Sequence, residues 1–109
     1  MKSRTIANSL LRIEGLASSA PPPFEHPLQG GDFAVLELGS HWKVEDWATH
    51  IAQALHTHGA AIREMHRGGA NVVLFVESAS ESSVRFQAEL LRVLADADIT
   101  LEHYAHANA

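Results

Sequence analysis

The sequence predicts an α+β fold built as a two-layer sandwich, in which a sheet of roughly four strands carries two main helices on one face. Three observations predict it. Short apolar runs alternate with longer segments of helical periodicity. Turn residues separate these segments, and all four prolines lie in one stretch. The 109 residues, 46% of them hydrophobic, suffice for a single domain over 1–109 with its own core.

The first segment, 6–14, fits two structures. Apolar and charged residues alternate over Leu10–Glu14, which favours a strand, whereas Ile6, Leu10 and Ile13 are spaced as in a helix. We prefer the strand, because a neighbouring strand would give it a partner. The stretch 16–32 holds all the prolines, and three consecutive prolines cannot lie inside a helix. It is therefore expected to be a long loop, and loops of this length are functional or mobile.

Three further strands are expected, at Phe33–Leu38, Asn71–Glu77 and Ile99–Tyr104. The first two are nearly continuous apolar runs, which is typical of strands buried on both faces. In the last strand, apolar and polar residues alternate. The tail over 105–109 is short, polar and rich in alanine, so we expect it to fray.

Two amphipathic helices are expected between these strands. The first begins at Val44 and is ended by Gly59, after which a shorter helical piece covers Ala60–Arg67. The second covers Val84–Ala95, with a serine at 82 or 83 as its N-cap. The order strand, long loop, strand, helix, strand, helix, strand is of the ferredoxin-like type, and right-handed crossovers place both helices on one face. The other face is then open to solvent, a ligand or a second subunit.

The charge of the chain narrows the class of partner. The formal net charge is -5, from 13 acidic and 8 basic residues. Proteins bind nucleic acids through clustered lysine and arginine, so neither a nucleic acid nor an anionic membrane surface is expected as partner. A basic protein fits better. No apolar run approaches a membrane span, and Arg12 and Glu14 interrupt the stretch that resembles a signal peptide, so a cytoplasmic location is expected.

No catalytic residue, cofactor or metal site is predicted. The chain has no cysteine, which excludes a disulfide scaffold and thiolate chemistry. Eight histidines are present, but no helical histidine has another four residues on, the spacing that a helical metal site uses. Asp96 and Asp98 lie at a turn, where carboxylates are usually solvated. The serines of 78–83 lack the glycine-flanked elbow of a nucleophile and are explained as turn and capping residues.

Four residues are candidates for contact with a protein partner. Trp47 belongs to the apolar stripe of the first helix and is expected in the core. Trp42, beside His41, lies between strand and helix, where it either covers the core or is an exposed anchor for a partner. The same two alternatives, a cover for the core or an exposed contact for a partner, apply to Phe24 and His26 in the Pro-rich loop. The predicted partner-binding residues are therefore Phe24, His26, His41 and Trp42.

Four segments match the pattern of elements in a known family: Leu11–Gly15 as an opening strand, 47–65 as a helix in two parts, Val72–Val76 as the next strand, and 90–101 as a closing helix and strand. In this pattern the chain resembles the bacterial domain of unknown function 4279. The Pro-rich loop stands where that family has a helix, and Trp42 follows the second strand, inside which the family places a tryptophan. The family has no assigned activity, and its members occur near bacterial toxin genes. The resemblance therefore implies an immunity-type role.

Three functions are open at this point. The first is a non-enzymatic intracellular protein-interaction domain, which neutralises a toxin if the resemblance holds. The second is a regulatory domain that binds a small ligand at the subunit edges of a homodimer; exposed apolar residues on the free sheet face would support it. The third is a small enzyme that uses His26 with Glu25 in the long loop, which requires a cleft with convergent polar groups.

Overall fold

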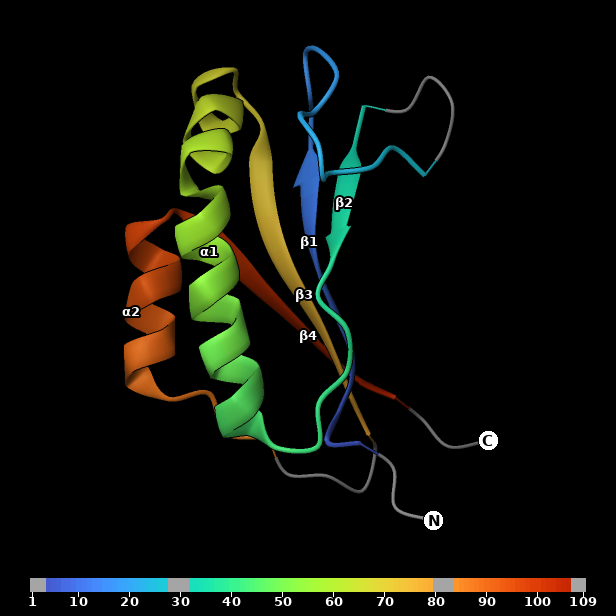
Figure 1. The fold of residues 1–109 in the computed structure, drawn as a ribbon, viewed down its shortest axis with the longest axis vertical. Coiled ribbons are helices and arrows are strands. Elements are labelled where there is room, and N and C mark those ends of the chain that lie inside the picture. The colour runs from blue at the N-terminus through green and yellow to red at the C-terminus, as the bar shows by residue number, and fades with distance from the viewer. Residues whose placement is uncertain (1–3, 28–31, 80–83, 107–109) are drawn as a thin grey trace.

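The fold is a four-stranded sheet covered on one face by two helices (Figure 1). The computed structural model describes residues 4–27, 32–79 and 84–106. The sheet order is β2-β1-β3-β4; β1 is antiparallel to β2 and β3, and β3 is parallel to β4. The α+β class and the placement of both helices on one face are confirmed. The elements are β1 (Ile6–Glu14), β2 (Ala34–Glu37), α1 (Val44–Arg67), β3 (Asn71–Ala79), α2 (Ala88–Asp96) and β4 (Ile99–His106).

The ambiguous first segment is a strand over its whole length, and it starts four residues before the predicted Leu10. The preferred alternative was right because β1 is an interior strand with a partner on each side. The pairing of β1 with β3 has a register shift between Ile6 and Asn8, near the start of β1. Because of this irregularity the side chains of Ile6 and Ser9 are both buried although the two residues are three positions apart, whereas Leu10 lies on the outer face of the sheet.

The long loop lies along the outer edge of β2. Glu25 and Val35 exchange two backbone hydrogen bonds, of 2.9 and 2.8 Å, in an antiparallel bridge. Phe24, next to it, turns inward and is 4% exposed in the core. The predicted loop thus serves as a cover for the short β2; its residues 28–31 lie outside the described part of the chain.

The prediction that Gly59 ends the first helix is wrong, because α1 runs without a break from Val44 to Arg67. His56 and His58 therefore lie in the middle of the helix. A glycine inside a helix costs only about 1 kcal/mol relative to alanine. Leu55 and Ile62, on either side of Gly59, are both buried in the core, and their packing outweighs that cost.

The second helix begins later than predicted. The strand β3 continues to Ala79, and α2 starts at Ala88 after an extended Gln87 that makes no side-chain cap. Phe86 explains the delay, since its ring packs edge-on against Trp47, with the ring centroids 5.8 Å apart. The predicted N-cap serines at 82 and 83 lie outside the described residues. At the other end, β4 continues two residues past the predicted Tyr104, and 107–109 of the predicted tail are not described.

The core lies between the helices and the inner face of the sheet. Its largest fully buried side chain is Trp47, as the apolar stripe predicted. The indole Nε1–H donates to the Ser9 hydroxyl at 3.1 Å, and Ser9 donates in turn to the Gly39 carbonyl at 3.0 Å. The second buried hydroxyl, Ser78, lies 2.9 Å from Nε2 of His103. Both buried polar side chains of this face are therefore hydrogen-bonded.

Candidate functional site

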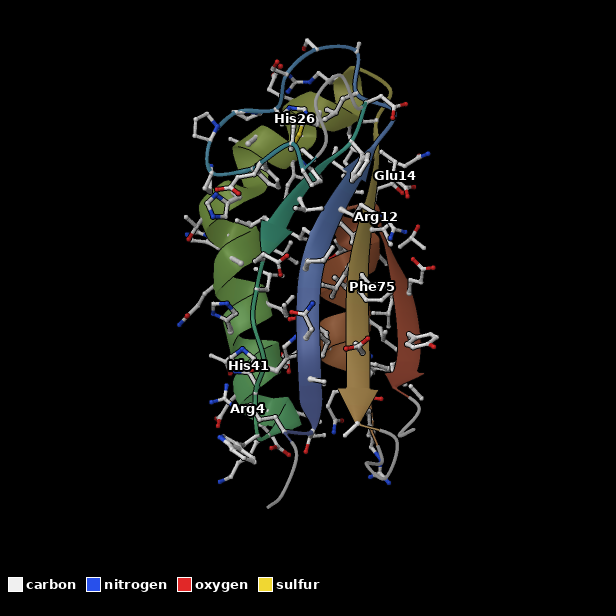
Figure 2. All side chains as sticks on the ribbon, turned by 90° about the vertical axis from the view of Figure 1, so that its right-hand side faces the viewer. Arg4, Arg12, Glu14, His26, His41 and Phe75 are labelled. Carbon is white, nitrogen blue, oxygen red and sulfur yellow. The ribbon has the colours of Figure 1, made fainter. Side chains whose placement is uncertain are left out.

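The predicted partner-binding residues lie at two ends of the molecule. His41 lies near Arg4 at one end, while His26 lies in the long loop at the other (Figure 2). Trp42 is 55% exposed, and the Arg4 guanidinium lies 5.3 Å from the centre of its ring. The His41 ring is tilted against that of His50, with centroids 5.2 Å apart. The structure thus brings Trp42 and His41 together as an exposed corner.

The two loop candidates do not join this corner. Phe24 is in the core, where its ring meets the edge of His58 at 5.9 Å, so it offers no surface to a partner in this structure. His26 is exposed, but its ring closes the loop on itself. The Ala20 N–H donates to Nε2 at 3.0 Å, and Nδ1 lies 3.0 Å from the Phe33 carbonyl oxygen, to which it donates.

The helices leave the outer face of the sheet, called the open face below, uncovered. It is turned toward the viewer in Figure 2, with the helices behind it. Residues directly opposite each other in neighbouring strands share a face, so the register defines what this face carries. Leu10 lies opposite Glu37 on one side and Phe75 on the other, and Phe75 lies opposite Glu102.

The middle of the open face is apolar. Leu10, Val35 and Phe75 are half-buried there. Val73 is only 8% exposed although no helix covers it. The side chain of Arg12 provides its cover, since Arg12 lies opposite Val73 and reaches past β3 to a residue of β4.

Arg12 ties three strands together across the open face. Its Nη2 donates to Glu102 Oε2 at 2.7 Å and its Nε donates to Glu14 Oε2 at 2.8 Å. The guanidinium carbon lies 6.0 Å from the centre of the Phe75 ring. Burial by itself lowers the pKa of Arg12, but the hydrogen bonds and charges of Glu102 and Glu14 outweigh it, so the pKa is raised above its ordinary value.

Carboxylates surround this apolar centre. Glu25 belongs with them because its bridge to Val35 places both side chains on one face. The resulting set, called the acidic ring below, lies on the loop and on all four strands. Among the described residues, five glutamates and one arginine carry the charges of this set. The acidic ring consists of Glu14, Glu25, Glu37, Glu77 and Glu102.

A second concave feature lies between the helices, at the end where α1 meets the turn from α2 to β4. It is an open groove of about 580 Å³ with Leu55, Ile62 and Val93 among its lining residues. Arg63, Asp96 and Asp98 also line it, and within 4–27, 32–79 and 84–106 none of these three forms an ion pair. This groove is called the helix groove below.

His66 also lines the helix groove, and its ring links two turns. Nδ1 lies 3.2 Å from the Ala70 carbonyl oxygen and Nε2 lies 3.1 Å from that of Ala97. Both partners are acceptors, so a neutral ring can donate to only one of them at a time. In the part of the chain that the structure describes, no three histidine or acidic side chains are grouped so as to hold a metal ion.

Comparisons with known proteins add nothing to this geometry: no family model, no curated protein and no solved structure matches the chain. None of the helices in the described residues is both long and apolar enough to span a bilayer.

The acidic ring is the feature that sequence reasoning missed. Each of its members occupies an outward position of a strand or of the loop, and the alternation around Arg12 and around Glu102 is visible in the sequence. What the sequence does not show is the strand order that brings them onto one surface. A count of the charged residues at outward positions of the predicted strands would have suggested an acidic sheet face.

Proposed function

We propose that this chain is a non-enzymatic protein-interaction domain that binds a basic protein on the open face of its sheet. The observation that carries the proposal is the acidic ring around an apolar centre. Apolar side chains there, Leu10, Val35 and Phe75, offer area that a partner can bury, while the ring selects partners of positive charge.

The arrangement also explains why a charged face is stable without a partner. Arg12 neutralises part of the ring and covers Val73, so the free protein leaves little of its centre fully exposed. Glu25 and Glu37 are exposed to solvent, where they steer a basic partner over distances of up to about 10 Å at moderate salt. Binding is therefore expected to be fast and to weaken as salt concentration rises.

The resemblance to the bacterial domain of unknown function 4279 implies a biological role for this binding, the neutralisation of a toxin. An acidic domain with its apolar surface inside a ring of carboxylates is suited to cover a basic surface on another protein. Trp42 and His41 lie at the end of the molecule beyond β2 and would extend such an interface past the sheet.

The test is affinity capture from source-cell lysate with three baits in parallel: the natural chain, Glu37→Lys and Asp96→Lys. Both substitutions change the charge equally at an exposed residue, but Glu37 belongs to the acidic ring and Asp96 lines the helix groove. We expect a basic protein in stoichiometric amount with the natural chain and Asp96→Lys. Its capture should fall at least about tenfold with Glu37→Lys, since about 1.4 kcal/mol of lost attraction suffices.

The same experiment can contradict the proposal. Equal capture by Glu37→Lys and the natural chain, or loss of the partner only with Asp96→Lys, would move the binding surface off the open face. Capture of no protein in stoichiometric amount by the natural bait would remove the support for a protein-interaction domain.

The helix groove favours a second candidate function, the binding of a small regulatory ligand. Its volume lies within the range of small-molecule sites, about 300–1,000 Å³, and it combines an apolar lining with groups of both charges. Such a lining suits a small zwitterion with an apolar side chain. Thermal unfolding in the presence of each of the common amino acids tests this: a ligand should raise Tm in the natural chain and in Arg92→Gln, but not in Arg63→Gln.

A further inference from the structure

The two edge strands of the sheet differ in length and in whether another segment pairs with their outward backbone groups. The outer edge of β2 is four residues long and is covered by the backbone of Glu25, which bonds Val35 in both directions. The outer edge of β4 is eight residues long, and among the described residues β4 pairs with β3 alone. Alternate residues of an edge strand direct N–H and C=O outward, so about four residues of β4 present unpaired backbone groups.

β4 also lacks the features that usually protect an edge. Natural edge strands carry lysine, proline, a bulge or an unpaired charge that opposes pairing. The segment 99–106 has neither lysine nor proline. Its one carboxylate, Glu102, is bound by Arg12 at 2.7 Å, and its register with β3 is uninterrupted. This edge is therefore open to pairing with another strand.

The helix above β4 adds an apolar flank on the same side. Leu90 and Leu94 face the core, and Val93 lines the groove toward α1. At 100° per residue, Leu91 projects from the opposite flank of α2, away from α1, together with Ala95. Leu91 is 42% exposed there. An exposed leucine beside an unpaired strand edge indicates that both would be covered by the same partner.

We propose that this partner is a second copy of the chain, with β4 pairing antiparallel to β4 of the other copy and Leu91 meeting its equivalent across the two-fold axis. Symmetric pairing satisfies the outward backbone groups of both β4 strands at once and creates a continuous eight-stranded sheet. Among the described strands, the edges left are those of the two β2 strands, which are four residues long and already pair with Glu25 at Val35. Association therefore stops at the dimer instead of continuing into a filament.

The side chains of β4 select the register. Opposed residues must share a face, so the axis passes through a single residue position. An axis at Glu102 would oppose two carboxylates, and an axis at Tyr104 would pair only five of the residues up to His106. An axis at His103 pairs seven residues and places Glu102 opposite Tyr104 of the second copy, whose hydroxyl can donate to the carboxylate. This register is the one we infer.

The dimer does not rest on the proposed function, because it uses the edge of the sheet and leaves the open face uncovered. Sedimentation equilibrium of the full chain should give twice the monomer mass of 11.8 kDa. Leu91→Lys and Tyr104→Lys should each raise the dimer dissociation constant at least about tenfold, as for a residue at the centre of an interface. Trp42→Lys changes a similarly exposed aromatic residue next to His41, which pairs with β1 and is separated from β4 by β3, and should leave it unchanged.

Cysteine chemistry tests the register, because the chain has no cysteine of its own. Under mild oxidation, an equimolar mixture of Glu102→Cys and Tyr104→Cys chains should form a disulfide-linked dimer faster than either variant alone. A natural chain that remains at 11.8 kDa up to about 1 mM would overturn the proposal. So would a dimer that survives both lysine variants, and a dimer lost in Phe75→Ser but not in Leu91→Lys would place the contact on the open face instead.

Discussion

The inner and the open face of the sheet come from alternate residues of the same four strands, but they satisfy their polar groups in different ways. On the inner face the two buried polar side chains of the described residues, Ser9 and Ser78, each have a hydrogen-bond partner within the protein. On the open face Glu25, Glu37 and Glu102 are exposed to solvent, and Arg12 pairs with Glu14 and Glu102.

The two faces should therefore differ in whether their substitutions change the free energy of unfolding or the binding of a partner. Unfolding exposes the inner face, so its substitutions should lower the free energy of unfolding strongly. The open face is already in contact with water, so its substitutions should change stability little and partner binding much. Three pairs of matched variants test this separation between the two faces.

The largest effect is expected from the two tryptophans. Trp47→Ala removes a fully buried indole and leaves a cavity, which should lower the free energy of unfolding by about 3–5 kcal/mol. Trp42→Ala removes an exposed ring that stacks on Arg4, which should cost less than about 1 kcal/mol. Urea unfolding followed by circular dichroism measures both. Similar losses in the two variants would contradict the assignment of Trp47 to the core.

An intermediate effect is expected from the buried hydroxyl beneath Trp47. Ser9→Ala leaves the indole Nε1–H and the Gly39 carbonyl without their partner, which should cost about 1–3 kcal/mol. Ser19→Ala, at an exposed position of the loop, should stay within about 0.5 kcal/mol. If Ser9→Ala unfolds at the same urea concentration as the natural chain, the inner face does not depend on this hydrogen bond.

The smallest effect on stability is expected from the open face. Arg12→Met keeps the stem that covers Val73 and removes the ion pairs with Glu14 and Glu102, which should cost about 1 kcal/mol or less because both carboxylates are exposed. Arg67→Met, which loses an exposed pair with Glu64, is the matched control. In thermal unfolding at low and high salt, the difference in Tm between Arg12→Met and the natural chain should become smaller as the salt concentration rises. A loss of several kcal/mol for Arg12→Met would make the open face a structural element.

The sequence predicted most of the inner face because burial leaves a periodic signal. The spacing around Trp47 and the apolar run at Val72–Val76 correspond to elements of the structure. The errors fall where packing overrides a local preference. Glycine commonly ends a helix, but the buried residues on either side of Gly59 stabilise α1 through this position. Phe86 was expected in the second helix, but its ring packs against Trp47 and it lies before the start of α2.

The open face was less predictable, for a different physical reason. Side chains in solvent have no packing requirement, so each glutamate of the acidic ring reads locally as an ordinary outward residue. Glu25 and Glu102 are 77 positions apart in the sequence and meet on one surface only through the order β2-β1-β3-β4. For Trp42 the sequence left two alternatives, a cover for the core and an exposed anchor; its side chain is exposed, and its contact with a partner stays a prediction.

The most direct test of the central claim is an amide chemical-shift map of the 15N-labelled chain, recorded as the captured basic protein is added. The proposal predicts that the largest changes fall on the outward positions of the sheet, around Leu10, Val35 and Phe75, and that they diminish as salt is raised. Changes concentrated at Arg63 and Asp96 in the helix groove, with the strands of the open face unaffected, would contradict it.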